Sequence, residues 1–316
     1  AFAAAFQLSE HSATGLGRAF AGEAAIADSA SVVASNPALM SYFKKAELSV
    51  VGTYILPDVG VSGESAPVYS SAAALDNDSI APEALIPAIY YVTPINEKVA
   101  IGFGVFSNFG LATEFPEDYA AGQLAGTSEI TTVNLNASVS YQIDAHWSVG
   151  MGLNYIYAEA NLVRHFGDNP LGLPAQTVAV DLEGDDSGYG WNAGFAYEIN
   201  KGSRLGLHYR SKTNLTFEGD YTNQLPAASG GLSGAVLPGY LDLELPATAE
   251  FSGVHSIDTK WTLNYSIVWT QWSHFESLEA YASESNTLLF SKKENFSNSF
   301  RYALGGSYQL DKNIKL

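Results

Sequence analysis

The side chains able to do chemistry in this 316-residue chain are few and scattered. Its histidines never stand in an HExxH arrangement or at another close spacing typical of a metal site. No GxSxG, Walker or Rossmann fingerprint lies between a predicted strand and a predicted helix. An outer-membrane phospholipase would need a serine nucleophile beside a histidine base at the lipid boundary. His146 and Ser148 are the pair nearest to this pattern, because they are close in sequence. Such pairs are common by chance, so we expect no enzyme activity, no metal site and no cofactor.

The kind of element that must position any functional side chain is clearest in Thr131–Asp144, TTVNLNASVSYQID. Its odd-numbered residues from Val133 to Ile143 are apolar, and the residues between them are polar but uncharged. Because successive side chains of a strand point to opposite faces, this pattern predicts a strand with one apolar and one polar face. It exceeds the ~5–6 residues of a usual globular strand. It suits a transmembrane β-strand, which needs about 9–11 residues.

The same alternation recurs along the chain, near residues 46–56, 85–95, 99–106, 149–157, 191–199, 204–212, 241–245, 260–269 and 300–310. Together with Thr131–Asp144, these segments predict about ten strands. The predicted fold is all-β, an antiparallel transmembrane β-barrel. The alternative is a soluble β-sandwich or β-helix, which would turn the apolar face into a core.

Composition agrees with a barrel. Apolar residues make up 47% of the chain and charged residues only 15%, against about 25% charged in soluble proteins. No apolar run reaches the ~18 residues of a transmembrane helix, and the 18 Tyr and 5 Trp stand often near strand ends, as in membrane-interface girdles. The net charge of −18 excludes a nucleic-acid partner. Acidic residues are expected in loops, for example Glu183, Asp185 and Asp186.

The first residues differ from the rest. Ala1–Ala3 fits the end of a secretory signal peptide, and the absence of cysteine suits a periplasmic environment. Residues 4–43 are rich in small residues and lack the strand alternation. We expect short helices at Ala19–Ala27 and at Pro37–Tyr42, where Ser35-Asn36-Pro37 indicates a cap with proline in the first helical turn. Low charge favours a partly helical plug in the lumen over a flexible tail, with residues 44–316 forming the barrel.

Arg164 is the best candidate for a cation inside the barrel. Val149, Met151 and Leu153 on the same predicted strand place the odd-numbered face toward lipid, so Arg164 points to the lumen if the parity holds. An arginine that lines a barrel is more often a solvated pore residue than a ligand-binding group. Pattern alone therefore leaves its role open.

Several short motifs follow one another in an order that resembles one known family. They are Phe6-Gln7-Leu8, Gly15-Leu16-Gly17-Arg18-Ala19, Gly22-Glu23, Ala25-Ile26-Ala27-Asp28, Asn36-Pro37-Ala38-Leu39, Ser107–Phe115, Gly190–Gly194 and Arg301–Gly305. In this order they resemble the FadL-type outer-membrane long-chain fatty-acid transport proteins (OMPP1/FadL/TodX). The similarity covers essentially the whole chain.

The resemblance implies a barrel of about fourteen strands in the outer membrane of a Gram-negative bacterium, with an N-terminal hatch in its lumen. It implies passive uptake of long-chain fatty acids, captured at the outer loops, bound in an apolar pocket and released sideways after the hatch moves. The expected partners are long-chain fatty acids or other hydrophobic small molecules, outer-membrane lipid and lipopolysaccharide, and bacteriophage. We expect a monomer.

The resemblance also assigns the ligand pocket. Arg164 and Lys292 stand where the family has its basic carboxylate-binding pair, with Lys293 as the alternative to Lys292. Leu162 would line the pocket beside Arg164. The residues assigned to the hatch and pocket from the N-terminal segment are Phe6, which would reach the ligand, and Asn36, Pro37 and Ala38.

The exit is assigned to Asn108, Phe109 and Gly110, which match a kink in the third strand that opens the barrel wall. Glycine's freedom of φ would tolerate the bend at Gly110.

Two departures from the family stand out. Only about ten strands are complete and Asn313–Leu316 resembles the start of an eleventh, so we expect a chain truncated at its C-terminus. The loops at Gly167–Gly188 and Asp220–Gly239 are compact, which would alter the outer substrate groove. The rival functions are a hydrocarbon or aromatic-compound channel of the same family and a surface receptor or structural barrel without transport.

Overall fold

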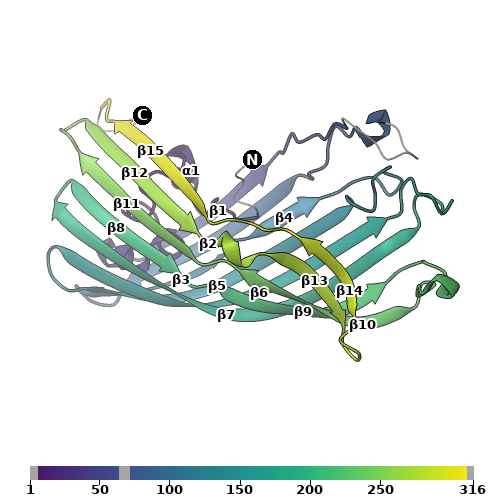
Figure 1. Ribbon diagram of the computed structural model, residues 1–316. Coiled ribbons are helices and arrows are strands. Elements are labelled where there is room, and N and C mark those ends of the chain that lie inside the picture. The colour runs from purple at the N-terminus through teal and green to yellow at the C-terminus, as the bar shows by residue number, and fades with distance from the viewer. Residues whose placement is uncertain (1–5, 64–71, 312–316) are drawn as a thin grey trace.

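A curved antiparallel sheet dominates the computed structural model, which describes residues 6–63 and 72–311 (Figure 1). Its strand segments are β1 (Glu47–Ile55), β2 (Ala84–Pro94), β3 (Val99–Phe106), β4 (Gly110–Thr113), β5 (Thr127–Gln142), β6 (Trp147–His165), β7 (Val178–Asn200), β8 (Ser203–Arg210), β9 (Thr213–Thr222), β10 (Val236–Leu245), β11 (Thr248–Ser256), β12 (Trp261–Thr270), β13 (Ser277–Ala282), β14 (Leu288–Lys293) and β15 (Ser299–Tyr308). The helices are α1 (Ala13–Gly17), α2 (Val32–Ser35), η1 (Pro37–Tyr42), η2 (Ala72–Leu75), η3 (Ala227–Ser229) and η4 (Trp272–His274). The predictions for Ala1–Ala3 and Asn313–Leu316 fall outside the described residues.

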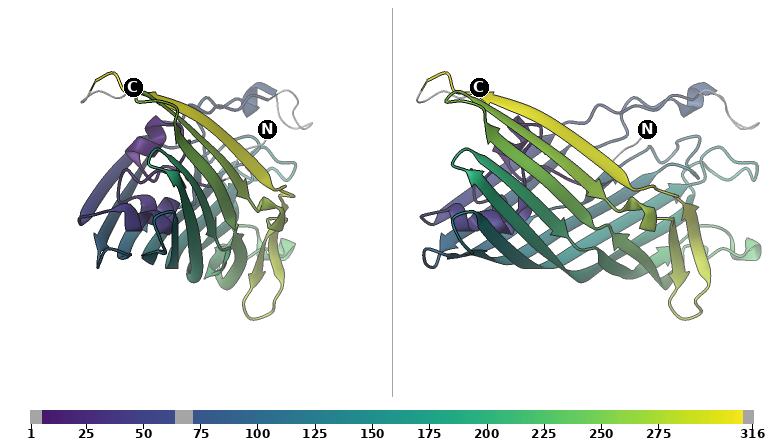
Figure 2. Two further views of the ribbon diagram at one scale, coloured as in Figure 1. Left: turned by 90° about the vertical axis from the view of Figure 1, so that its left-hand side faces the viewer. Right: turned by 60° about the vertical axis from the view of Figure 1, so that its left-hand side comes forward.

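The fifteen strand segments join end to end into ten strands. β3 and β4 both pair with β5, so they are two parts of one interrupted strand. In the same way, β8 and β9 both pair with β7 and are two parts of one strand. The next three strands are likewise each made of two segments that pair with the two segments of the strand before, namely β10 with β11, β12 with β13, and β14 with β15. The predicted antiparallel all-β fold is confirmed. Figure 2 shows the sheet curving round a lumen, with β1 and β15 as its edges.

The two faces of β5 have opposite environments. Asn134 and Ser140 are 1% and 0% exposed, whereas Leu135 and Tyr141 are 46% and 44% exposed. The polar face therefore lines the filled lumen and the apolar face points outward, the reverse of a soluble sandwich. Inside, Asn134 Nδ2 donates to Asn154 Oδ1 at 3.0 Å and Asn154 Nδ2 donates to Asn192 Oδ1 at 3.0 Å, which satisfies amide groups that would be costly to bury alone. Asn134 Oδ1 and Asn192 Nδ2, at the two ends of this chain, have no partner among the described residues.

The N-terminal segment, residues 6–43, lies on the concave side of the sheet (Figure 2). The helix expected at Ala19–Ala27 is wrong. Helix α1 ends at Gly17, and Ala19 and Phe20 take positive φ values of 50° and 63°, which a right-handed helix excludes. The helix at Pro37–Tyr42 is confirmed as the 3-10 helix η1, capped by the Asn36 side chain. In the described ranges, no helix is long and apolar enough to cross a membrane.

Hydrogen bonds between side chains and backbone join this segment to the wall. Ser266 Oγ accepts from Gly22 N–H at 2.9 Å, and Asn36 Nδ2 donates to the Phe195 carbonyl at 3.0 Å. At Gly194 an added Cβ would lie 1.9 Å from Asn36 Oδ1, so glycine is needed for this close approach. The segment is thus fitted to the wall at several points and does not hang free.

The loops are shorter than the sequence indicated. β7 begins at Val178, so the acidic residues at 183–186 lie on a strand, and their expected place in a loop is wrong. Glu183 stands opposite Asp220 and Asp185 opposite Glu218 on the outward face of β7 and β9. A strand that continues beyond the apolar band of the sheet can have charged residues on its outward face, and its sequence then resembles that of a loop.

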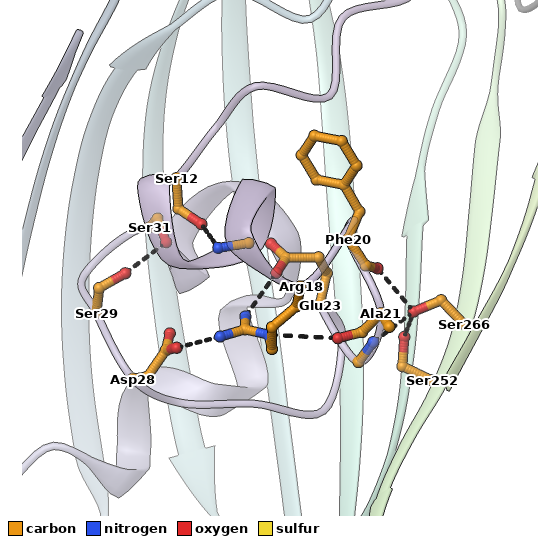
Figure 3. A network of polar contacts seen from close by, with 12 residues as sticks. Ser12, Arg18, Phe20, Ala21, Glu23, Asp28, Ser29, Ser31, Ser252 and Ser266 are labelled. Atoms are coloured by element: carbon orange, nitrogen blue, oxygen red, sulfur yellow. Dashed lines mark hydrogen bonds and ion pairs between the residues drawn. The ribbon is translucent and has the colours of Figure 1, made fainter. Parts of the chain in front are cut away.

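A charged network ties together the turns of the N-terminal segment (Figure 3). The Arg18 guanidinium forms ion pairs with Glu23, at 2.7 Å, and with Asp28. It also donates from Nε to the Ala21 carbonyl at 3.3 Å. Glu23 is 8% exposed, and burial raises its pKa to about 7 even though Arg18 lowers it.

We predict that Glu23 makes the stability of this segment depend on pH. A carboxyl group with a pKa of 4.5 when unfolded and about 7 when folded stabilises the fold below pH 4.5. That stability is lost as pH rises through 7, which lowers the free energy of unfolding by about 3 kcal/mol. Glu23→Gln should abolish this decrease in the free energy of unfolding between acid and alkaline pH, as measured by urea unfolding in detergent. Glu97→Gln, in an exposed turn, serves as the control. A Glu23→Gln variant that keeps the full pH dependence would contradict the assignment.

Candidate ligand-binding site

A cavity of about 320 Å³ lies between Phe6 and the wall, and residues of β4, β9, β10, β13 and β14 contribute to its lining. Figure 1 shows where these segments lie in the sheet. Pockets for small molecules have volumes of ~300–1,000 Å³ and mainly apolar walls with a few polar groups. The apolar lining here consists of Phe6, Leu111, Ile130, Ala160, Leu162, Leu182, Phe217, Leu241, Leu243, Phe275, Leu278 and Phe296. Volume and lining both suit an apolar ligand.

Arg164 lies in the lining of this cavity near the end of β6, and its side chain points inward as the parity predicts. It is 5% exposed. Its Nη1 donates to the carbonyls of Thr127 and Val163, both at 2.7 Å, and its Nη2 donates to Ser128 Oγ at 2.8 Å. These bonds fix the guanidinium on the wall. A guanidinium has five N–H donors, so donors remain for a ligand.

Lys292 lies in the same lining, whereas its neighbour Lys293 does not. Its Nζ forms an ion pair with Glu294 Oε1 at 2.8 Å, and Glu294 also interacts electrostatically with Arg164. The Glu294 side chain is 18% exposed and the Lys292 side chain 48% exposed. A protein carboxylate therefore already interacts with both cations in the lining of this cavity.

Phe6 closes another side of the cavity within an aromatic cluster. Its ring centroid is 4.8 Å from that of Trp272, 5.9 Å from Phe109 and 5.8 Å from Phe275, all edge to face. Phe6, Phe109 and Trp272 are 7%, 3% and 1% exposed. Edge-to-face pairs of this kind stabilise each other by ~0.5–1.5 kcal/mol beyond burial. Phe6 is thus the anchor of the first residues of the described chain.

The strand that contains β3 and β4 is interrupted at residues 107–109, and the N-terminal segment pairs with the interruption. The Leu8 N–H donates to the Asn108 carbonyl at 2.8 Å, and the Gly110 N–H donates to the Phe6 carbonyl at 2.9 Å. Thr132 Oγ1 donates to the Phe109 carbonyl at 2.6 Å. The segment therefore supplies hydrogen-bond partners for backbone groups that the wall leaves free at the kink.

The reason expected for glycine at position 110 is wrong. Gly110 does not have a φ in the left-handed region, so the bend does not require its conformational freedom. An added Cβ would instead lie 3.1 Å from Leu8 Cδ1. Glycine here allows the N-terminal segment to lie close against the wall.

The structure brings four of the predicted residues together, since Phe6, Leu162, Arg164 and Lys292 all line the cavity. Asn36, Pro37 and Ala38 do not line it. They are completely or almost completely buried against another part of the wall, where η1 contacts β5, β6 and β7.

Sequence reasoning missed two contributors to the site. Glu294 stands two positions beyond Lys292, and this i, i+2 spacing on an extended segment is the signal that would have paired them. Trp272 lies in the short helix η4, where strand alternation gave no guide to its orientation.

A second cavity, of about 60 Å³, lies on the other side of Phe109 and is polar. Its charged and polar lining includes His11, Glu23, Asn108, His208, Arg210, Glu250 and Arg301. The volume is enough for several water molecules but not for an alkyl chain. The lumen thus changes from apolar to polar across Phe6 and Phe109.

His146 and Ser148 do not form a nucleophile–base pair. His146 lies in an exposed turn with its Nδ1 2.7 Å from the Glu198 carbonyl oxygen, whereas Ser148 is completely buried on the inner face. Within residues 6–63 and 72–311, no group of three or more His, Cys, Asp and Glu side chains could hold a metal ion.

The chain has close similarity to known proteins. Residues 1–316 match the family model described as outer membrane protein transport protein (OMPP1/FadL/TodX). A long-chain fatty acid transport protein of Salmonella typhi is 41% identical, over 99% of this chain and 76% of that protein. A Pseudomonas aeruginosa FadL homologue of known structure has a TM-score of 0.80 at 20% identity, over 98% of this chain and 79% of its own. The structure of the Ralstonia pickettii toluene transporter TbuX has a TM-score of 0.62 at 17% identity, over 93% of this chain and 82% of its own.

We predict that Phe6→Ala releases the first residues from the aromatic cluster. Removal of a buried phenylalanine side chain destabilises its packing by about 3–5 kcal/mol. The few backbone hydrogen bonds of residues 6–8 would not be enough to hold the segment in place without it. Protease cleavage near residues 6–12 should become much faster while the melting temperature of the sheet changes little. Leu16→Ala, on the same segment but 47% exposed, is the control. Cleavage as slow as in the wild type would show that Phe6 is not the anchor.

Proposed function

This chain belongs to the OMPP1/FadL/TodX family of outer membrane transport proteins, and we propose that it carries long-chain fatty acids passively across the outer membrane. The observation that carries this proposal is an apolar cavity with Arg164 and Lys292 at one side. An alkyl chain needs the apolar wall and its carboxylate needs the two cations. Residues 4–43 would act as the hatch and residues 44–316 as the barrel.

The ligand carboxylate would bind beside Arg164 and Lys292, where it would replace the Glu294 carboxylate as their partner. Arg164 is held by the wall, so it offers a fixed donor without losing side-chain freedom on binding. Lys292 is half exposed and forms its ion pair with Glu294, so it can turn to a ligand. A ligand carboxylate would then replace one charge-assisted bond with another, and the alkyl chain supplies the net gain.

The bound ligand would not continue straight along the lumen. Beyond Phe6 and Phe109 the lumen is polar and closely filled, and moving alkyl groups through it would leave buried polar groups without partners. The kink at Asn108–Gly110 lies directly beside Phe6. We propose that movement of Phe6 frees both the cavity and the kink, and that the ligand leaves sideways into the membrane.

A hydrocarbon channel of the same family is the rival. A neutral aromatic compound needs no cation, so the pairing of Lys292 with Glu294 beside Arg164 would have no purpose for it. The test therefore compares a charged with a neutral ligand.

We predict that the double variant Arg164→Ala, Lys292→Ala weakens the binding of a fluorescent palmitate analogue by at least about tenfold. Each lost charge-assisted hydrogen bond contributes about 1.5–3 kcal/mol. Binding of the methyl ester of the same analogue, which has no carboxylate charge, should change by less than about threefold. Binding is measured by saturation fluorescence in detergent.

Lys293→Ala, next to Lys292 but outside the cavity lining, is the matched control and should bind normally. Equal losses for acid and ester in the double variant would remove the carboxylate role. Absence of binding in the wild type as well would favour the hydrocarbon or receptor functions.

A second prediction concerns the exit. Gly110→Val would place side-chain carbons into the contact with Leu8, only 3.1 Å from the position of a Cβ, and fill the proposed opening. Uptake of radiolabelled oleate by cells should fall severalfold, whereas binding to the purified protein should stay within about twofold. Gly17→Val, where nothing lies within 4 Å, is the control. Normal uptake would exclude this exit, and lost binding would place Gly110 in the pocket.

A further inference from the structure

One row of inward positions in the ligand cavity carries almost no side chain. Ala160, Gly184, Gly219 and Gly239 stand directly opposite one another on β6, β7, β9 and β10. All four line the cavity. With strands about 4.8 Å apart, the row extends for about 14 Å across the wall.

Larger side chains border the row on both sides. Leu162 and Leu182 stand opposite each other two positions away on one side. Phe217 and Leu241 do so on the other side. These four residues also line the cavity. The row is therefore the floor of a groove, with backbone at the bottom and apolar side chains as its edges.

Backbone torsion does not explain the glycines. None of Gly184, Gly219 and Gly239 has a φ in the left-handed region. At Gly219 a Cβ would lie 1.9 Å from the Glu183 carbonyl oxygen, so glycine lets β7 and β9 approach closely. At Gly239 the nearest atom is the Tyr281 carbonyl oxygen at 3.2 Å, so a small side chain fits with slight adjustment. Neither the torsion nor severe crowding requires glycine at position 239.

We propose that this groove takes the alkyl chain of the bound ligand and that its small residues set the chain length accepted. The inference rests on the proposed function, because it assumes the carboxylate at Arg164. Arg164 lies on β6 four positions from Ala160, so both side chains are on the inner face. From there the chain runs across β6, β7, β9 and β10. Short chains end near Ala160, and long unbranched chains reach Gly239.

The groove favours linear ligands. A methylene chain is narrow enough to lie between two rows of side chains, and each methylene that leaves water contributes about 0.8 kcal/mol. A filled position should therefore exclude the part of the chain beyond it, at a cost of about fourfold in affinity per displaced methylene.

The test uses Ala160→Leu and Gly239→Val in the full chain, with octanoate and palmitate as competitors of a bound fluorescent fatty acid. Gly239→Val should weaken the binding of palmitate by more than about tenfold and leave the affinity for octanoate within about twofold of the wild type. Ala160→Leu, nearer the carboxylate, should weaken palmitate at least as much. Ala160→Leu needs no change at a glycine, so it provides the result if Gly239→Val does not fold.

Ser187→Leu adds a similar side chain on the outer face of β7 and should bind both acids normally. Equal effects on octanoate and palmitate, or no effect on either, would overturn the assignment of the groove while leaving the carboxylate site intact. If the wild type bound neither acid, the proposed function would fail, and the groove assignment with it.

Discussion

The backbone pairing between the N-terminal segment and the interrupted wall strand links every functional part of this structure. Leu8 and Gly110 donate hydrogen bonds across it, and Phe6 beside it closes the apolar cavity. A backbone group without a partner in the membrane costs several kcal/mol. The kink in the wall can therefore persist only while another segment satisfies it. Displacement of Phe6 would disturb the cavity and the interrupted strand together, and our proposal of a movement that couples binding to release depends on this link.

Electrostatics and packing divide the lumen into two parts. On one side of Phe6 and Phe109 the lining is mainly apolar, and its charged residues are Arg164, Lys292, Glu294, Glu129, Glu183 and Asp220. Of these, Glu294 interacts with both cations. On the other side the lining is polar and the free volume is small. A ligand with one charged end and a long apolar tail matches the first part and is excluded by the second. This division is the physical basis of the sideways exit that we propose.

Alternation predicted the strands because a wall with one lipid face and one lumen face must repeat every two residues. It also oriented Arg164. It failed where side-chain direction depends on contacts distant in sequence. The turns at Ala19 and Phe20 follow from packing on the wall. The charge around Glu183 indicates a loop in the sequence because a strand beyond the lipid resembles a loop in composition. The reason for glycine at position 110 was visible only once Leu8 was seen against it.

A crystal structure with palmitate that carries bromine on its last carbon would test the proposed position of the ligand. Anomalous scattering would locate the bromine, and the electron density would locate the carboxylate. We expect the carboxylate oxygens within about 3 Å of Arg164 and Lys292 nitrogens, the Glu294 side chain turned away, and the bromine at the distant end of the cavity. Bromine beside Arg164, or a ligand outside the cavity, would contradict the proposed position.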